Sequence, residues 1–256
     1  MSLLWPETIS IGLFPDHCWI KRGRLEAAHR IDAGALGAPA DLLGALEQML
    51  GAPGKPLRKG TRLRLLVSDS VVSIATLPWQ EQLMAPDELH AYAQACFEKQ
   101  GLAMDAGWTL HAGFRQYGAL GMAHAIRHEW LEAVIALAKT QGAQVRSVIP
   151  VSACAYWRQG RSSKLQQTLV LLHEARRVSA LIYDHGVLQG FDVEPILSSE
   201  VSAGERLLRR ISATHSTIGS VCAWSAHAPE LAPKFDFIKD RLPGAKLNFY
   251  DRNIWS

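Results

Sequence analysis

The sequence lacks several features that would assign it to a common class of protein. Its 256 residues contain no apolar run near the ~20 residues needed to cross a bilayer. The first residues lack the basic segment and long apolar segment of an export signal. The four cysteines form no CxxC pair and stand far apart, at Cys18, Cys96, Cys154 and Cys222. We therefore expect reduced, buried thiols, a cytoplasmic location and no direct membrane insertion.

Signatures of catalysis and of ligand binding are also missing. There is no GxxxxGK[ST] loop, no GxGxxG loop and no GxSxG elbow. His124 and His128 are spaced to share a helix face, but Glu129 follows the pair and no third ligand is evident. We expect surface histidines at a strand–helix junction, and no metal or other cofactor. The net charge of +3 is mild, so no nucleic-acid partner is expected.

Two stretches of alternating apolar residues organise what is present. The stretch 168–191 predicts a three-stranded meander, with strands at Leu169–Leu172 and Val178–Tyr183, an Asp184-His185-Gly186 turn, and a third strand from Val187. The same plan opens the chain, with strands expected at Ile9–Phe14, Cys18–Lys21 and Leu25–Ile31. Two meanders, each followed by a helical pattern, predict a duplicated α/β unit.

The remaining periodicity predicts helices and strands that follow each meander. Helices are expected at Asp41–Leu50, Pro86–Lys99, Glu129–Thr140, Ser152–Trp157, Ser202–Thr214 and Phe235–Asp240. Strands are expected at Leu63–Val67, Val71–Leu77, Trp108–Tyr117, Gly121–Ile126, Val145–Ile149, Ser220–Ser225 and Lys246–Tyr250. The polar segment Gln159–Lys164 has no periodicity and marks the expected boundary between subdomains, at 1–158 and 159–256.

Charged residues and helix caps give weaker predictions. Pro86 with two following acids predicts a helix start, and Ser202 with Glu205 fits a capping box. We interpret Arg206, Arg209 and Arg210 as a solvated basic face. The basic run from Lys55 to Arg64 is interpreted as a solvated loop, with a small anionic contact surface as the alternative.

The order of these elements resembles the duplicated actin-like (ribonuclease H-like) ATPase fold, in which two subdomains each have a mixed sheet flanked by helices. Within it, the chain resembles the branch containing PilM of type IV pili and the cytoplasmic part of GspL of type II secretion. Three stretches carry the resemblance: a strand pair at Leu63–Trp79 ending in Leu-Pro-Trp, the crossing segment Gly142–Ala153, and the second meander.

The resemblance also implies what an ATPase of this fold needs, which is two phosphate loops with a carboxylate and glycines, and a glycine-rich adenosine loop. Here the first turn has Phe14 where a carboxylate is expected, and Asp16 follows Pro15 without a glycine. The second turn has His173 and Glu174, again without Asp-x-Gly. Val221–His227 stands at the adenosine loop. All three elements are expected to be degenerate, and ATP hydrolysis is not expected.

The resemblance implies a non-catalytic adaptor that binds the cytoplasmic tail of an inner-membrane partner in a groove of the first subdomain. We place the groove near Leu77, Pro78, Trp79 and Leu89. Self-association is left open. GspL continues into a membrane span and this sequence ends at Ser256, so a standalone PilM-like protein and a segment of a larger product both remain open.

Two rival functions also remain. One is a nucleotide-dependent enzyme, an ATPase or small-molecule kinase, with atypical loops built on Asp16, Asp69 and Glu174. The other is an anion- or nucleic-acid-binding module that uses the basic run from Lys55 to Arg64.

Overall fold

The computed structural model describes residues 7–22, 29–31, 39–51, 57–82, 85–158, 167–197, 202–215, 217–226 and 235–249. The chain forms two compact units. Unit 1 comprises Met1–Ser73, Asp105–Thr109 and Ala125–Val151, and unit 2 comprises Ile74–Met104, Leu110–His124 and Ser152–Ser256. The boundary between the units therefore passes through three strands of a segment that is inserted into the chain of unit 1, after Val67 and before Ala143.

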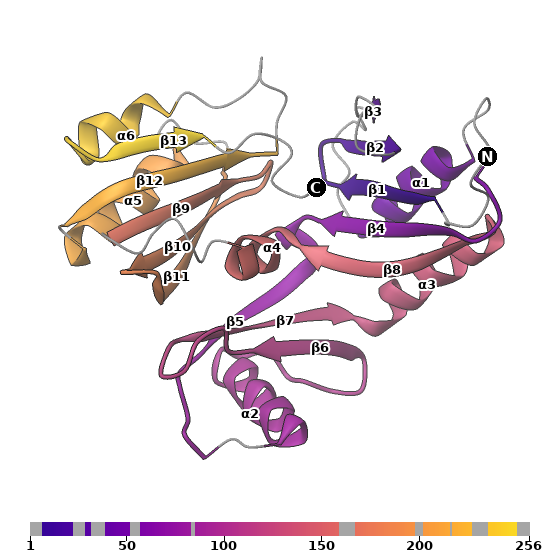
Figure 1. Ribbon diagram of the computed structural model, residues 1–256, viewed down its shortest axis with the longest axis horizontal. Coiled ribbons are helices and arrows are strands. Elements are labelled where there is room, and N and C mark those ends of the chain that lie inside the picture. Colours follow the sequence, from indigo (N-terminus) through magenta and orange to yellow (C-terminus); the bar gives the residue numbers. More distant parts are fainter. Residues whose placement is uncertain are drawn as a thin grey trace. The chain divides into compact units, whose positions relative to one another are not determined.

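Unit 1 contains a five-stranded sheet in the order β3-β2-β1-β4-β8 (Figure 1). Its strands are β1 (Thr8–Leu13), β2 (Cys18–Arg22), β3 (His29–Ile31), β4 (Thr61–Val67) and β8 (Ala143–Pro150). The first three strands pair antiparallel, and β1, β4 and β8 run parallel. The expected third strand began at Leu25, but residues 25–28 lie outside the described residues.

Helices α1 (Pro39–Leu50) and α3 (His128–Thr140) contact this sheet and each other. Alternate residues of β1 and β4 bury their side chains fully, including Ile9, Ile11, Leu63 and Leu65. The apolar stripe of α1 (Leu42, Leu46, Met49) is buried as well. One face of the sheet is therefore a helix-covered core, because the apolar residues repeat every second position along each strand.

Unit 2 contains an equivalent sheet in the order β11-β10-β9-β12-β13. Its strands are β9 (Gln167–His173), β10 (Arg177–Asp184), β11 (Val187–Pro195), β12 (Ile218–Ser225) and β13 (Lys246–Phe249), and its helices are α5 (Ala203–Thr214) and α6 (Asp236–Arg241). In the β10–β11 turn, His185 and Gly186 have φ angles of 49° and 82°, which suits a two-residue hairpin turn.

The two sheets confirm the predicted duplication. Each begins with a three-stranded meander, and a helix follows before the fourth strand, which pairs parallel with the first. The strand order is the same in both. The registers also match, because Leu13 pairs with Cys18 and Val67, while His173 pairs with Val178 and Ser225. We use these pairings below to compare equivalent positions.

Between β4 and β8 the chain inserts a third sheet in the order β5-β7-β6, and α4 (Val151–Arg158) follows β8. The insertion holds a 3-10 turn (Asp69–Val71), β5 (Val72–Leu77), α2 (Pro86–Lys99), β6 (Trp108–Gly113) and β7 (Gly121–Arg127). The two strands expected within Leu63–Trp79 are confirmed as β4 and β5, joined by the 3-10 turn, but they do not pair with each other because they belong to different sheets. The strand predicted to reach Tyr117 ends at Gly113.

The arginines predicted on one face of α5 are paired with acids, while Arg209 and Arg210 keep 62% and 49% of their side-chain surface exposed to solvent. The guanidinium of Arg206 lies 2.7 Å from Glu194, and that of Arg210 lies 2.7 Å from Asp192 and 2.8 Å from Glu194. These two arginines lower the pKa of Glu194. Arg209 lies 3.6 Å from Glu205, one helical turn earlier. The prediction missed Asp192 and Glu194 because they come from β11, which is separated from α5 in sequence.

Other local predictions are confirmed. The Ser202 hydroxyl accepts the backbone N–H of Glu205 at 3.1 Å and caps α5. Helix α2 begins at Pro86. All four cysteines are free and buried. As a separate finding, no helix within the described ranges is both long enough and apolar enough to cross a membrane.

Candidate functional site

The first candidate feature is the turn that joins β1 and β2. The backbone N–H of Phe14 donates to the carbonyl of His17 at 3.0 Å and closes the turn. The Phe14 side chain is 0% exposed, and its ring stacks on the His17 imidazole with centroids 5.0 Å apart and planes 9° from parallel. Asp16 lies 2.9 Å from the His17 Nδ1 atom. The turn is therefore filled by its own side chains.

The glycine nearest this turn is also covered. Gly12 pairs with Trp19 across the β1–β2 hairpin, and the indole of Trp19 occupies the position that a Cβ atom on Gly12 would take. In a phosphate loop, glycine serves to leave the backbone open to the ligand. Here the ring of Trp19 closes that opening.

A buried carboxylate follows the neighbouring strand at the same edge of the sheet. The Ser68 N–H donates to the Leu13 carbonyl at 2.9 Å, which brings the end of β4 beside the end of β1. Asp69 begins the 3-10 turn after Ser68, and neither residue is exposed to solvent. This acid belongs to the same unit as Asp16, whereas Glu174 belongs to the other unit.

The turn between β9 and β10 repeats the backbone geometry of the first. The Glu174 N–H donates to the Arg177 carbonyl at 2.9 Å, and the Ala226 N–H donates to the His173 carbonyl at 2.9 Å. Glu174 is buried and His173 is half-buried, with its ring edge-on to Phe235 at 6.3 Å. The second turn therefore also lacks glycine and holds its acid inside the protein.

Two further features concern the expected adenosine loop and metal ligands. Val221–Ser225 is the second half of β12 rather than a loop, and His227 lies outside the described residues. Across the parts of the chain that the structure describes, no three acidic, histidine or cysteine side chains gather closely enough to hold a metal ion.

The histidines considered as metal ligands lie on different elements. His124 is in β7 and His128 begins α3, so they do not share a helix face. His128 is exposed, as predicted, but His124 is buried and its Nε2 atom lies 3.1 Å from the Ser152 hydroxyl. Burial, with a smaller effect of His111, lowers the pKa of His124 to about 3. The sequence missed this pair because Ser152 comes from α4.

The expected partner-binding residues lie around the end of β5. Leu77 is buried, Pro78 is exposed, and Trp79 and Leu89 are half-buried. The Tyr92 hydroxyl donates to the Pro78 carbonyl at 2.9 Å, which ties this segment to α2. Pro78, Trp79 and Leu89 thus offer side-chain surface to a partner, and Leu77 anchors them from inside.

Two aromatic residues missed by the sequence complete this surface. Phe114 and Tyr117, from the β6–β7 connection, place their rings 5.0 Å and 4.8 Å from that of Trp79. Tyr117 is 81% exposed. We name Pro78, Trp79, Phe114 and Tyr117 the aromatic surface. The strand assigned through Tyr117 hid this loop, although Gly118 was a sequence signal for a turn.

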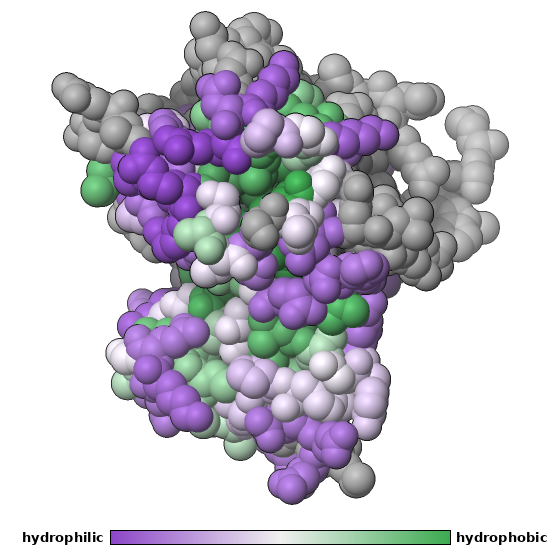
Figure 2. All heavy atoms as spheres, turned by 90° about the vertical axis from the view of Figure 1, so that its left-hand side faces the viewer, coloured by the Kyte–Doolittle hydropathy of each residue, from purple (hydrophilic) through white to green (hydrophobic). Residues whose placement is uncertain are grey.

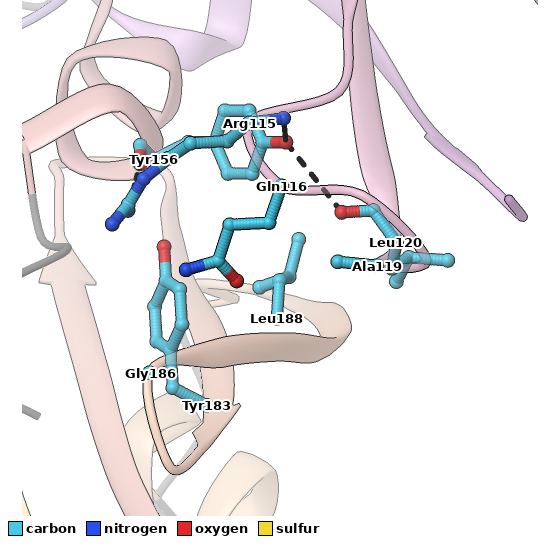
Figure 3. Close-up of a pocket in the computed structure, with 8 residues that line it drawn as sticks. All are labelled: Arg115, Gln116, Ala119, Leu120, Tyr156, Tyr183, Gly186 and Leu188. Carbon is cyan, nitrogen blue, oxygen red and sulfur yellow. Dashed lines mark hydrogen bonds between the residues drawn. The ribbon is translucent and has the colours of Figure 1, made fainter. Parts of the chain in front are cut away.

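A crevice beside the same loop contains no ligand-sized space. Its walls include Arg115, Gln116, Tyr156 and Tyr183 (Figure 3). The Arg115 backbone N–H donates to the Tyr156 hydroxyl at 2.8 Å, and its guanidinium donates to the Tyr156 carbonyl at 2.8 Å. The side chains fill the crevice too closely for a bound molecule. These contacts fix the β6–β7 loop against α4 and support the aromatic surface.

Comparison with known proteins identifies the fold. No protein-family model matches the chain, and no curated protein sequence matches it. A Bacteroides thetaiotaomicron protein with an actin-like ATPase fold and unknown function has a TM-score of 0.65 at 9% identity, covering 95% of this chain and 90% of that one.

Two further solved structures cover nearly the whole chain. The PilM–PilN type IV pilus biogenesis complex has a TM-score of 0.65 at 11% identity, covering 96% of this chain and 88% of that one. The cytoplasmic domain of EpsL, an inner-membrane component of the Vibrio cholerae type II secretion system, has a TM-score of 0.50 at 11% identity, with 98% and 88% covered. These likenesses show that the chain has the actin-like ATPase fold.

Proposed function

We propose that this chain is a non-catalytic actin-like adaptor of a type IV pilus or type II secretion assembly. In this role it binds the cytoplasmic tail of an inner-membrane partner through the aromatic surface and Leu89. The partner would hold the adaptor at the inner membrane. The fold alone does not carry this proposal, because unrelated functions share one fold.

The observation that carries the proposal is the closure of both hairpin turns. A triphosphate needs several backbone N–H groups directed at it and a carboxylate placed for Mg²⁺. At the first turn, the Phe14 N–H is bonded to His17 and the turn's space is filled by stacked rings. At the second, the Glu174 N–H is bonded to Arg177 and the carboxylate is buried.

The aromatic surface supports the binding half of the proposal. Tryptophan and tyrosine are enriched among the residues that dominate protein–protein affinity. Trp79 and Tyr117 lie in ring contact, with much of Tyr117 in solvent. Figure 2 shows that apolar side chains on the face in view form separate patches bordered by hydrophilic ones. Peptides are recognised by pockets and grooves that take a few of their side chains, which is the mode proposed for the aromatic surface.

A nucleotide titration tests the non-catalytic half. Ligands that bind only the folded state raise the melting temperature by mass action. We expect no rise in melting temperature at millimolar Mg-ATP. A rise that disappears in Asp69→Asn would instead support the nucleotide-dependent enzyme and overturn the adaptor proposal.

A binding experiment tests the other half. The probe is a synthetic peptide of the cytoplasmic tail of a single-span membrane protein encoded beside this chain. We expect Trp79→Ala to weaken binding by about tenfold or more, as for other aromatic hot spots. Ile135→Ala, which truncates an exposed apolar side chain on α3, is the matched control and should leave affinity unchanged. Equal affinity of Trp79→Ala and the wild type would exclude this surface.

A further inference from the structure

The unit 1 sheet has a second face, opposite the one that α1 and α3 cover, and this face is polar and basic. Its residues follow from the strand registers. Ser10 of β1 pairs with Lys21 of β2 and Arg64 of β4, and Arg64 pairs with Ser147 of β8. One row away, Thr8 pairs with Arg62, and Arg62 pairs with Gln144. We name these eight residues the basic sheet face: Thr8, Ser10, Lys21, Arg62, Arg64, Gln144, Ser147 and the bulge residue Arg146.

The arginines of this face are available to a ligand. Arg64 and Arg146 are exposed, and Arg62 is half-buried. None of their guanidinium groups forms a hydrogen bond or ion pair within the described part of the chain. The sequence interpretation of the basic run as a loop was wrong for Arg62, which lies on β4, whereas Arg64 falls within the strand expected at Leu63–Val67. Two residues apart on one strand, their side chains point to the same side.

An apolar row borders the basic residues. Gly12 pairs with Trp19 and Leu66, and Leu66 pairs with Ile149. Trp19 is half-buried and Ile149 is exposed. The face therefore combines guanidinium groups, hydroxyl and amide groups, and one apolar edge.

The equivalent face of the unit 2 sheet carries buried residues in place of the polar and basic residues of unit 1. The register places Val170, Leu181 and Cys222 at the positions of Ser10, Lys21 and Arg64, and all three are buried. Parallel strands such as β1, β4 and β8 normally have both faces covered. A surface that packs on the polar face of unit 1 would therefore need polar and acidic side chains to match it.

We infer that the basic sheet face docks an acidic amphipathic segment of a partner polypeptide. Its carboxylates pair with Arg62, Arg64 and Arg146, and its apolar side chains lie along Trp19 and Ile149. Arginine favours such pairing because its planar fork binds carboxylates in a bidentate manner. The mix of separated arginines, hydroxyls and an apolar edge suits a polypeptide better than a lipid surface, which is recognised by dense lysine and arginine clusters. This surface is separate from the aromatic surface of the proposed function.

Fluorescence anisotropy with labelled peptides tests this inference. The first probe is a helical peptide with glutamates on one face and leucines on the other, and the second has the same composition in scrambled order. We expect the intact chain to bind the amphipathic probe more tightly than the scrambled one. Arg62→Glu/Arg64→Glu should weaken binding of the amphipathic probe about tenfold, and raising salt from about 50 mM to about 300 mM should weaken the wild type.

The controls separate a local effect from net charge and from misfolding. Lys239→Glu/Lys246→Glu changes the net charge equally at exposed positions of unit 2 and should leave affinity unchanged. Arg62→Gln/Arg64→Gln, a milder change, should reduce affinity about threefold if the pairing is local. Trp79→Ala should bind this probe normally, which distinguishes failure here from failure of the proposed function.

Three outcomes would overturn the inference. The first is equal affinity of Arg62→Glu/Arg64→Glu and the wild type for the amphipathic probe. The second is equal affinity of the wild type for both peptides. The third is arginine-dependent sedimentation with phosphatidylglycerol vesicles, or binding to duplex DNA, in the absence of peptide binding.

Discussion

The two meander sheets share strand order and register but differ in the residues on one face, which in unit 1 is the face opposite α1 and α3. In unit 2 this face carries Val170, Leu181 and Cys222, all buried, whereas the same positions in unit 1 are Ser10, Lys21 and Arg64. Hydrogen bonding between strands needs only an extended backbone, so the apolar residues of unit 2 and the polar residues of unit 1 are equally compatible with the same strand pairing. The comparison teaches that topology was duplicated while the chemistry of the second face was not.

The β1–β2 and β9–β10 turns share a backbone geometry but differ in the side chains that they enclose. Both are closed by a hydrogen bond from the first residue of the turn to the fourth, Phe14 to His17 and Glu174 to Arg177. One encloses an aromatic ring and the other a carboxylate. The backbone plan of an actin-like fold therefore persists at these turns without the glycines that open it to phosphate.

The largest test exchanges equivalent residues of the two sheets. Cys222→Arg places an unpaired charge in a buried face and should lower the free energy of unfolding by about 3–5 kcal/mol, or prevent folding. Arg64→Cys, the reciprocal change on the exposed face, should alter it by less than about 0.5 kcal/mol. Urea unfolding followed by circular dichroism measures both. Equal effects would break the comparison.

A second test concerns Gly12, whose equivalent in unit 2 is Leu172. Gly12→Ala adds a methyl group where the Trp19 indole lies and should destabilise the protein by about 1–3 kcal/mol. Gly44→Ala in α1 is the matched control, because its added methyl meets nothing, and it should stabilise by about 0.5–1 kcal/mol. Thermal unfolding gives both values. A neutral Gly12→Ala would show that Trp19 does not close this position.

The third test uses His124 in β7, a strand of the third sheet, which is inserted between β4 and β8. His124 has a pKa of about 3 in the folded state, below its ordinary value of 6.5, because it is buried. Between these two values the unfolded chain binds a proton that the folded chain does not. Stability should therefore fall as pH is lowered, by about 1.4 kcal/mol per pH unit.

Urea unfolding between pH 7 and pH 5 measures this slope. His124→Gln keeps a polar group near Ser152 but cannot titrate, so it should remove the His124 contribution. His128→Gln, at an exposed histidine, is the control and should retain it. A wild-type slope unchanged by His124→Gln would contradict the assignment.

The smallest expected effect is at the helix that follows the second meander. Ser202→Ala removes the hydroxyl that accepts the Glu205 N–H and should cost about 1 kcal/mol. Ser212→Ala, in the last turn of the same helix, is a control outside the cap. Chemical denaturation measures the difference, and an equal cost at both positions would argue against capping.

Local sequence patterns predicted much of this fold. The alternating residues of β9 and β10 located the second meander, and Ser202 with Glu205 located the start of α5. The patterns failed where two distant segments decide the outcome. Leu63–Trp79 contains two strands, but nothing local shows that β4 and β5 enter different sheets. The ion pairs of Arg206 and Arg210 were missed because their partners Asp192 and Glu194 lie on β11.

The candidate sites divide in the same way. The absence of Asp-x-Gly at Phe14 and Glu174 could be read directly from the residues, because it depends only on the residues of each turn. The contact between the rings of Trp79 and Tyr117 could not be predicted from the residues, because Trp79 follows β5 and Tyr117 lies in the β6–β7 connection.

The sequence by itself determined the repeated strand–helix order, the helix caps and the absence of Asp-x-Gly from the two turns, because each depends on residues within a few positions of one another. The tertiary structure decided which face of each sheet is buried, which arginines are paired, and that Arg62 and Arg64 lie on the face opposite α1 and α3. These features depend on strand register and on packing between distant segments, which no local pattern encodes.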